Sequence, residues 1–166
     1  IDSNVRWLRM RGNGMTGVLN MSCICNLRKL EILHLGRNLI HDTTIECVVS
    51  SLKELQLAEN AIYDFIPTCG ADGESFFPEL ERLDLSFNNI RTVPGYEASV
   101  CLPNLKELLL EENSITGNDY GGLFDAKLFP VLQHLDLTKM GSQDYLYQLT
   151  FDNSIVQFLS LAKNLL

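Results

Sequence analysis

The stretch LERLDLSFNNI, residues 80–90, contains the pattern that decides the fold. Its leucines alternate as in a short strand, yet a pair of asparagines, which are disfavoured in strands, follows at once. The same offsets recur in three further segments: LEILHLGRNLI at 30–40, LKELQLAENAI at 52–62 and LKELLLEENSI at 105–115. Four copies indicate a repeat architecture rather than one strand that runs into one turn.

The first asparagine of each copy defines a position that recurs along the whole chain. The aligned residues are Asn13, Asn38, Asn60, Asn88, Asn113 and Asn164, with Met140 in the slot between the last two. Successive spacings are 25, 22, 28, 25, 27 and 24 residues. Each copy should contribute one strand, so we expect seven strands, from VRWLRM at 5–10 to VQFLSL at 156–161.

A buried role for this asparagine follows from the path of the chain. Side chains alternate faces in a strand, so Leu83 and Leu85 should point inward and Asp84 outward. The chain then turns and leaves backbone groups inside the coil, where each unpaired group costs about 1–3 kcal/mol. An asparagine side chain offers donors and an acceptor to such groups. We therefore expect a buried structural ladder of the aligned asparagines, whereas Asn89 should be exposed.

The spacing and the pattern L-x-x-L-x-L-x-x-N-x-L resemble those of leucine-rich repeats. The resemblance implies one α/β repeat domain over residues 1–166, an uncapped solenoid fragment of a longer protein. Its curved parallel sheet should line the concave face, and irregular or short helical segments should form the convex side. Apolar residues three positions before the first leucine of a copy should close the core from the convex side: Leu27, Val49, Phe77, Leu102 and Phe129.

Uneven repeat lengths, N-x-I endings, scattered cysteines and long loops at 63–78 and 116–130 resemble the ectodomain of a Toll-like receptor. That resemblance implies an extracellular fragment of a single-pass innate immune receptor that binds a protein or microbial ligand through its concave face or loops. It also implies a receptor homodimer or heterodimer, and contact with the membrane only through parts missing from this fragment. The alternative is a cytosolic leucine-rich repeat scaffold for protein partners.

Composition narrows the classes of partner. Of the 166 residues, 46% are hydrophobic, as in a folded domain, and the net charge is −8 with a pI near 4.8. The electrostatic field of this net negative charge repels nucleic acid and anionic membranes, so we expect no nucleic-acid partner at neutral pH. No apolar run approaches the length of about 18 residues that spans a bilayer.

The outward positions of the strands supply the candidate binding residues. Neighbouring strands should stack equivalent positions into columns, in which Glu54, Arg82 and Glu107 alternate in charge. The candidate ligand- and partner-binding residues are Trp7, Arg9, Ile32, His34, Arg82, Asp84, Phe87, Glu107, Leu109, His134, Asp136 and Phe158. Of these, Trp7, Ile32, Leu109 and Phe158 are expected as exposed apolar anchors. An ordinary solvated surface is the alternative for any one of them.

Five cysteines and one glycosylation sequon favour an oxidising compartment. Cys25 and Cys47 occupy matching positions in neighbouring turns, and Cys69 and Cys101 lie in adjacent convex segments, so both pairs are candidate disulfides. Pairing of Cys47 with Cys69 and buried free thiols remain alternatives. The sequon Asn20-Met21-Ser22 makes Asn20 a candidate glycosylation site.

Cofactor, metal and catalytic motifs are absent or weak. GNGMTG at 12–17 matches the dinucleotide pattern G-x-G-x-x-G, but such a site needs a helix there and an acidic residue at the end of the next strand, which ends at Leu35-Gly36. The histidines at 34, 41 and 134 lie in different repeats. Cys23 and Cys25 could suggest a metal site, but no second cysteine or histidine pair stands at ligand spacing. We expect no cofactor, no metal site and no enzymatic activity.

Overall fold

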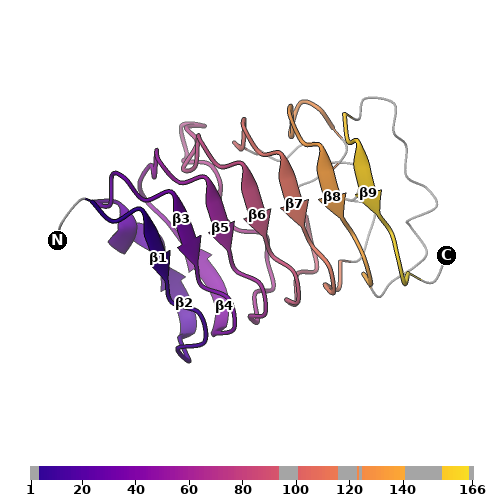
Figure 1. Cartoon of the computed structure of the whole chain (residues 1–166), viewed down its shortest axis with the longest axis horizontal. Coiled ribbons are helices and arrows are strands. Elements are labelled where there is room, and N and C mark those ends of the chain that lie inside the picture. The colour runs from indigo at the N-terminus through magenta and orange to yellow at the C-terminus, as the bar shows by residue number, and fades with distance from the viewer. Residues whose placement is uncertain (1–3, 94–100, 116–122, 124, 141–154, 165–166) are drawn as a thin grey trace.

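A computed structural model of the chain describes residues 4–93, 101–115, 123, 125–140 and 155–164. Within these ranges seven short parallel strands lie side by side in one sheet, in the order β1-β3-β5-β6-β7-β8-β9 (Figure 1). The strands are β1 (Trp7–Arg9), β3 (Ile32–His34), β5 (Glu54–Gln56), β6 (Arg82–Asp84), β7 (Glu107–Leu109), β8 (His134–Asp136) and β9 (Phe158–Ser160). The predicted leucine-rich repeat solenoid and its seven strands are confirmed.

The register of the sheet aligns equivalent residues of successive repeats. One column runs across all seven strands through Trp7, Ile32, Glu54, Arg82, Glu107, His134 and Phe158. A second runs through Arg9, His34, Gln56, Asp84, Leu109, Asp136 and Ser160. The period of the repeat thus fixes which side chains meet on the concave face.

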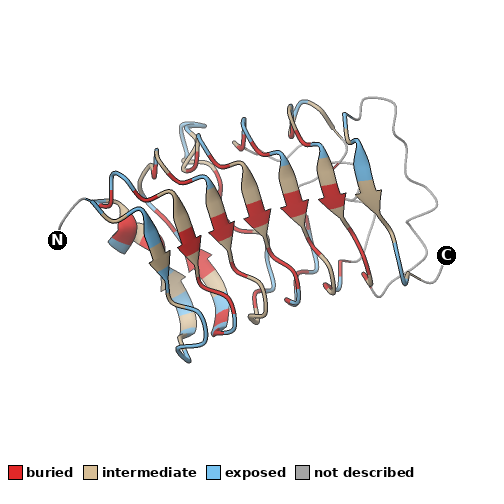
Figure 2. Cartoon of the chain, in the orientation of Figure 1, coloured by how far each residue is buried: buried red, intermediate tan, exposed pale blue. Residues whose placement is uncertain are grey.

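The core is one continuous apolar column behind this sheet. The middle residue of β3, β5, β6, β7 and β8 is a buried leucine in each case, which gives the red band across these strands in Figure 2. The predicted convex residues close the core from the other side, and all five are buried: Leu27, Val49, Phe77, Leu102 and Phe129. Full burial of such a side chain contributes about 1.5–3 kcal/mol, so stacking of turns stabilises each repeat.

The aligned asparagines link successive turns by hydrogen bonds. Asn88 Nδ2 donates to Leu85 O in its own turn and to Leu57 O in the preceding turn, both at 3.0 Å. Its Oδ1 accepts from the backbone N–H of Ile62 at 3.0 Å. Equivalent bonds within the turn and to the preceding turn are made by Asn38, Asn60, Asn113 and Asn164.

Two positions depart from this ladder. The expectation of a buried ladder holds for Asn38, Asn88 and Asn113, whereas Asn60 and Asn164 are half-buried. Asn13 is exposed, because no turn lies on its N-terminal side in the described part of the chain. Asn13 contributes to the ladder through its backbone, since its N–H donates to Asn38 Oδ1 at 2.9 Å. At the sixth position Met140 is fully buried and apolar, and its backbone N–H donates to Asn164 Oδ1 at 2.8 Å.

The residue before each ladder position has a left-handed backbone. Six of these residues are not glycine, and their φ angles lie between 52° and 57°: Arg37, Glu59, Phe87, Glu112, Lys139 and Lys163. Gly12 holds the equivalent place in the first turn, with φ 70°. L-residues avoid this region, so the turn that places the asparagine inside costs about 1–2 kcal/mol in each repeat with a side chain there.

A second, two-stranded parallel sheet follows the ladder in the first two turns. It consists of β2 (Thr16–Asn20) and β4 (Leu39–Thr44). Its first strand begins within GNGMTG, where a dinucleotide site would need a helix. Gly12 and Gly14 have positive φ in the turn before the strand, and Gly17 has positive φ within β2, where the register with β4 shifts. The short 3₁₀ helix η1 (Met21–Ile24) follows, capped by Asn20, whose Oδ1 accepts from Ser22 N–H.

Two disulfides join neighbouring convex segments in the predicted pairs. Cys25 bonds Cys47 and Cys69 bonds Cys101, which leaves Cys23 free and exposed and excludes the alternative pairing of Cys47 with Cys69. The 63–78 loop is anchored by the second disulfide and by buried Ile66 and Phe77. The loop predicted at 116–130 lies largely outside the described residues.

In the described ranges no helix is long and apolar enough to cross a membrane.

Candidate functional site: the concave face

A row of charged and titratable side chains crosses five strands of the concave face. We call it the charged row, and it consists of His34, Glu54, Arg82, Glu107 and His134. Arg82 lies at its centre, with Nη1 3.4 Å from Glu107 Oε2 and Nε 4.0 Å from Glu54 Oε1. The predicted alternation of charge at Glu54, Arg82 and Glu107, which share the first column, therefore gives contacts across the sheet.

Each carboxylate of the charged row also faces a histidine on its outer side. His34 Nε2 lies 3.6 Å from Glu54 Oε1, and His134 Nδ1 lies 3.2 Å from Glu107 Oε1. These two contacts become ion pairs only when the imidazoles are protonated. Gln56 Nε2 donates to Glu54 Oε1 at 2.5 Å, so Glu54 is the more heavily contacted carboxylate. The row orders the side chains that a partner would meet.

The four predicted apolar anchors differ in exposure. Trp7 on β1 is 64% exposed and Phe158 on β9 is 56% exposed, whereas Ile32 and Leu109 are half-buried. The expectation of four exposed anchors is wrong for the latter two, because strands on both sides shield a central position and only one shields an edge position. Phe158 packs edge-on against His134, with ring centroids 4.5 Å apart.

A hollow of about 260 Å³ lies beside the charged row. It brings together four of the predicted residues, His34, Asp84, Phe87 and Leu109. Its other lining residues are Arg11, Gly36, Gln56, Ala58, Glu59, Ser86 and Glu111. The predicted residues that do not line it are Trp7, Arg9, Ile32, Arg82, Glu107, His134, Asp136 and Phe158.

Small residues create this hollow. Gly36 and Ala58 occupy equivalent positions in adjacent turns, and a Cβ on Gly36 would lie 3.0 Å from the carbonyl oxygen of Ala58. A larger side chain at position 36 would displace that backbone. The hollow is therefore fixed by the main chain.

A two-arginine clamp on Glu59 borders the hollow. Arg37 Nε donates to Glu59 Oε2 at 2.8 Å and to Oε1 at 2.9 Å, and Arg11 Nη2 donates to Oε1 at 2.8 Å. Hydrogen bonding from Arg37 lowers the pKa of Glu59; burial opposes this, and the charges of Arg37 and Arg11 lower the pKa further. Sequence reasoning missed this clamp, although opposite charges stand at equivalent positions 37 and 59.

Phe87 is the apolar member of the same border. It precedes the ladder residue Asn88, its φ is 55°, and its ring is 41% exposed. A bulky aromatic residue in this backbone region is uncommon. Phe87 and Leu109 thus offer apolar contact, while Asp84 and Glu111 offer hydrogen-bond acceptors.

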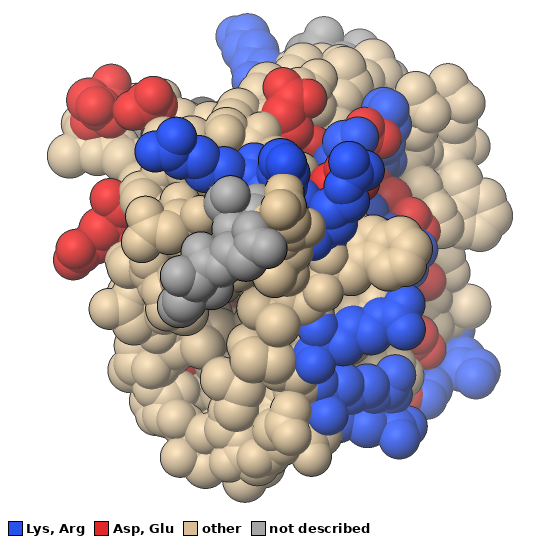
Figure 3. All heavy atoms as spheres, turned by 60° about the vertical axis from the view of Figure 1, so that its left-hand side comes forward, with Lys and Arg blue, Asp and Glu red and all other residues tan. Residues whose placement is uncertain are grey.

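Charge is unevenly distributed along the solenoid. Residues 1–40 contain six of the 13 Lys and Arg residues but only two of the 21 Asp and Glu residues. Figure 3, which brings the N-terminal side forward, shows Lys and Arg side chains gathered there. Arg9 belongs to this basic end and makes no ion pair with any described residue. The concave face is therefore basic at its first strand and acidic beyond it.

The arrangement suits noncovalent recognition. The charged row, the hollow and the exposed rings at the edges provide shape, charge and apolar contact on one sheet. Among the described residues, no group of three or more His, Cys, Asp or Glu side chains could hold a metal ion.

Comparisons with known proteins agree with this architecture. The family model described as Leucine Rich Repeat matches residues 79–97, and no curated protein matches the chain. A crystal structure of an internalin from Listeria monocytogenes superposes on 87% of the chain with a TM-score of 0.56 at 21% identity. The present chain spans 38% of that internalin chain. By its fold, then, the chain is a leucine-rich repeat solenoid, with a family-matched repeat in the segment that includes Asn88 and Asn89.

Proposed function

We propose that this chain is a nonenzymatic recognition module that binds a protein partner on its concave face. The observation that carries the proposal is the hollow lined by His34, Asp84, Phe87 and Leu109 beside the charged row. A partner side chain that enters the hollow would contact Phe87 and Leu109 and would meet acceptors on Asp84. Contacts of this kind, an apolar anchor in a pocket with polar groups around it, dominate the energy of protein interfaces.

The charge distribution sets the orientation of the partner. The basic first strand with Arg9 favours an acidic patch, and the acidic middle of the sheet favours a basic side chain near Asp84. The summed charge of −8 disfavours a nucleic-acid partner at neutral pH.

We further propose that the module belongs to the ectodomain of an innate immune receptor of Toll-like type, on the extracellular side of the membrane. Two disulfides, uneven repeats and the exposed sequon residue Asn20 support this assignment. The ligand is then a protein or microbial molecule, and the receptor acts as a homodimer or heterodimer.

Photo-crosslinking tests the concave face. A photoreactive benzoylphenylalanine replaces Phe87 in the protein on its native cell, and the same group replaces exposed Lys127 on the convex side as the matched control. We expect one dominant adduct at position 87 that Leu109→Asp removes and that position 127 does not give. Equal adducts at both positions, or an adduct indifferent to Leu109→Asp, would contradict the proposal.

Thiol counting and glycosidase treatment test the compartment. Protein from its native source is unfolded, alkylated without reduction and digested, and the peptides that carry the five cysteines and Asn20 of residues 1–166 are weighed. One free thiol and a mass loss at Asn20 on deglycosylation are expected for the receptor. Five free thiols and an unmodified Asn20 would overturn the receptor assignment in favour of the cytosolic scaffold.

A further inference from the structure

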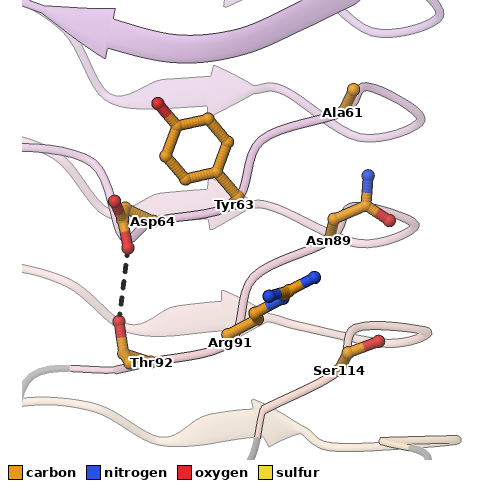
Figure 4. A pocket seen from close by; sticks show the side chains of 7 residues that line it. All are labelled: Ala61, Tyr63, Asp64, Asn89, Arg91, Thr92 and Ser114. Carbon is orange, nitrogen blue, oxygen red and sulfur yellow. Dashed lines mark hydrogen bonds between the residues drawn. The ribbon is translucent and has the colours of Figure 1, made fainter.

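A second recess lies on the flank of the solenoid, away from the concave face. Its volume is about 720 Å³, and it is lined by Ala61, Tyr63, Asp64, Asn89, Arg91, Thr92 and Ser114 (Figure 4). We call it the flank groove. Its residues follow the ladder asparagines of three successive turns, so the groove runs across the turns. The repeat motif leaves Ala61, Asn89 and Ser114 free in residue type and ends before the other lining residues, and the concave-face columns include none of them.

The main chain holds the lining in place. The backbone N–H groups of Ala61, Asn89 and Ser114 each donate to a carbonyl of the preceding turn, at 2.8–3.0 Å. The N–H of Arg91 donates in the same way to Tyr63 O at 3.2 Å. Since these backbone N–H groups are paired with carbonyls of the preceding turn, the side chains remain for recognition.

At one end of the groove the polar side chains are hydrogen-bonded to each other. Thr92 Oγ1 donates to Asp64 Oδ1 at 3.5 Å, and the guanidinium of Arg91 points away from this pair, towards the side of Asn89 and Ser114 (Figure 4). No described residue forms an ion pair with Arg91. The opposite end therefore presents donors: a guanidinium, an amide and a hydroxyl.

Tyr63 forms an apolar wall between the two ends. Its side chain is 43% exposed, and its ring stacks on His41 of β4 with centroids 6.0 Å apart and planes 16° apart. Ala61 adds only a methyl group, which leaves room over the ring. A flat or aliphatic group fits this wall, whereas a second anion would meet Asp64.

We propose that the flank groove binds an extended peptide segment of a partner protein through one Asp or Glu side chain. The carboxylate pairs with the Arg91 guanidinium in the two-bond geometry that planar groups allow, and Asn89 and Ser114 donate to its free lone pairs. The neighbouring peptide residue lies over Tyr63.

The dimensions favour a peptide. Three turns about 4.8 Å apart span about 10 Å, which is the length of three extended residues. A polyanion is disfavoured because Asp64 and the net charge of −8 repel further negative charges. This site does not depend on the concave-face proposal, since the two sets of lining residues do not overlap.

A displayed library of random heptapeptides, selected on the 166-residue chain, tests the proposal. We expect enrichment of peptides with one Asp or Glu next to an aromatic or aliphatic residue. Binding of an enriched peptide, measured by fluorescence anisotropy, should weaken about tenfold or more in Arg91→Gln, because a charged hydrogen-bonded pair is lost. The matched Glu→Gln peptide should bind Arg91→Gln and the unchanged protein alike.

Arg28→Gln is the matched control, because Arg28 is an exposed arginine far from the groove. Arg28→Gln should leave the peptide affinity unchanged, and circular dichroism should be the same for both variants. Selection of no peptide, selection of peptides without an acid, or equal losses in both variants would overturn the proposal. Free glucuronate that competes as well as the Glu peptide would also overturn it, in favour of a carboxylated sugar.

Discussion

Asn88 Oδ1 accepts a hydrogen bond from the backbone N–H of Ile62, 26 residues earlier in the chain, at 3.0 Å. One buried side chain thus connects two turns, while its sequence neighbour Asn89 is exposed. The pair of asparagines in this repeat has two unequal roles.

Replacement of Asn88 by Ala should therefore destabilise the protein. It leaves the Ile62 N–H and the carbonyls of Leu57 and Leu85 without this partner inside the coil, so we expect a loss of about 1–3 kcal/mol in urea unfolding. Asn89→Ala should cost less than about 0.5 kcal/mol, as for an ordinary surface substitution. Equal losses in the two variants would mean that the ladder register is wrong.

The left-handed turn before Asn88 gives a second prediction. Phe87 has φ 55°, a region that glycine occupies without the steric cost that alanine meets. Phe87→Gly should be more stable than Phe87→Ala by about 1 kcal/mol in denaturant unfolding. Both variants lack the exposed ring and should lose concave-face binding equally. The reverse order of stability would contradict the backbone assignment.

The centre of the charged row can be tested by removal of one charge. Arg82→Met deletes the contacts to Glu54 and Glu107 and leaves two half-buried carboxylates on either side. We expect a loss of about 0.5–1 kcal/mol, measured by thermal unfolding. Lys106→Met, which removes the exposed pair with Glu81, is the control and should cost less. A larger effect in the control would show that the row does not stabilise the sheet.

The clamp on Glu59 predicts a pH dependence. Its pKa is lowered in the folded protein, chiefly by hydrogen bonding from Arg37, so the folded state favours the carboxylate. The resulting stability is fully present above the unfolded value of about 4.3 and is lost as pH falls through the lowered native pKa. In urea unfolding, the stability difference between the unchanged protein and Glu59→Gln should be present at about pH 7 and should shrink as the pH falls below the unfolded pKa. A difference independent of pH would contradict this origin.

The disulfide between Cys69 and Cys101 should be a large single contribution to stability. Its ends are 32 residues apart, and closure of such a loop in the unfolded chain is worth about 3–4 kcal/mol. The double variant Cys69→Ser/Cys101→Ser should lose about that amount in guanidinium unfolding. Cys23→Ser is the control, because that thiol is free and exposed, and it should change stability little. A double variant as stable as the control would contradict the prediction.

The sequence predicted most of the fold because the repeat makes one local rule apply seven times. The spacing of Leu83, Leu85 and Asn88 was enough to place the strands, their register and the core. The positive φ at Phe87 was not predicted, since sequence preference favours glycine there and the turn imposes the conformation instead.

The candidate site was predicted less completely. Columns on the sheet follow from the register, so Glu54, Arg82 and Glu107 were brought together correctly. The depth of each side chain depends on its neighbours, which is why Ile32 and Leu109 are less exposed than expected. The flank groove was not predicted at all, because positions after the ladder asparagine carry no pattern that periodicity can detect.

Because Met140 replaces an asparagine, the coupling between neighbouring repeats is not the same along the whole solenoid. In an array whose stability is a sum over neighbouring units, each asparagine adds a coupling between its turn and the preceding one. Met140 omits that coupling between the fifth and sixth turns, and the ion pair of Lys139 with Glu112 bridges the same two turns at the surface. The side-chain polar contact at this position is thus partly exposed to salt and solvent, beside the backbone bonds Leu110 N–H to Asp136 O and Glu112 N–H to Thr138 O, whereas the amides of Asn38, Asn88 and Asn113 are buried. We therefore expect the coupling between the fifth and sixth turns to depend on ionic strength more than the coupling at the turns that carry a buried asparagine.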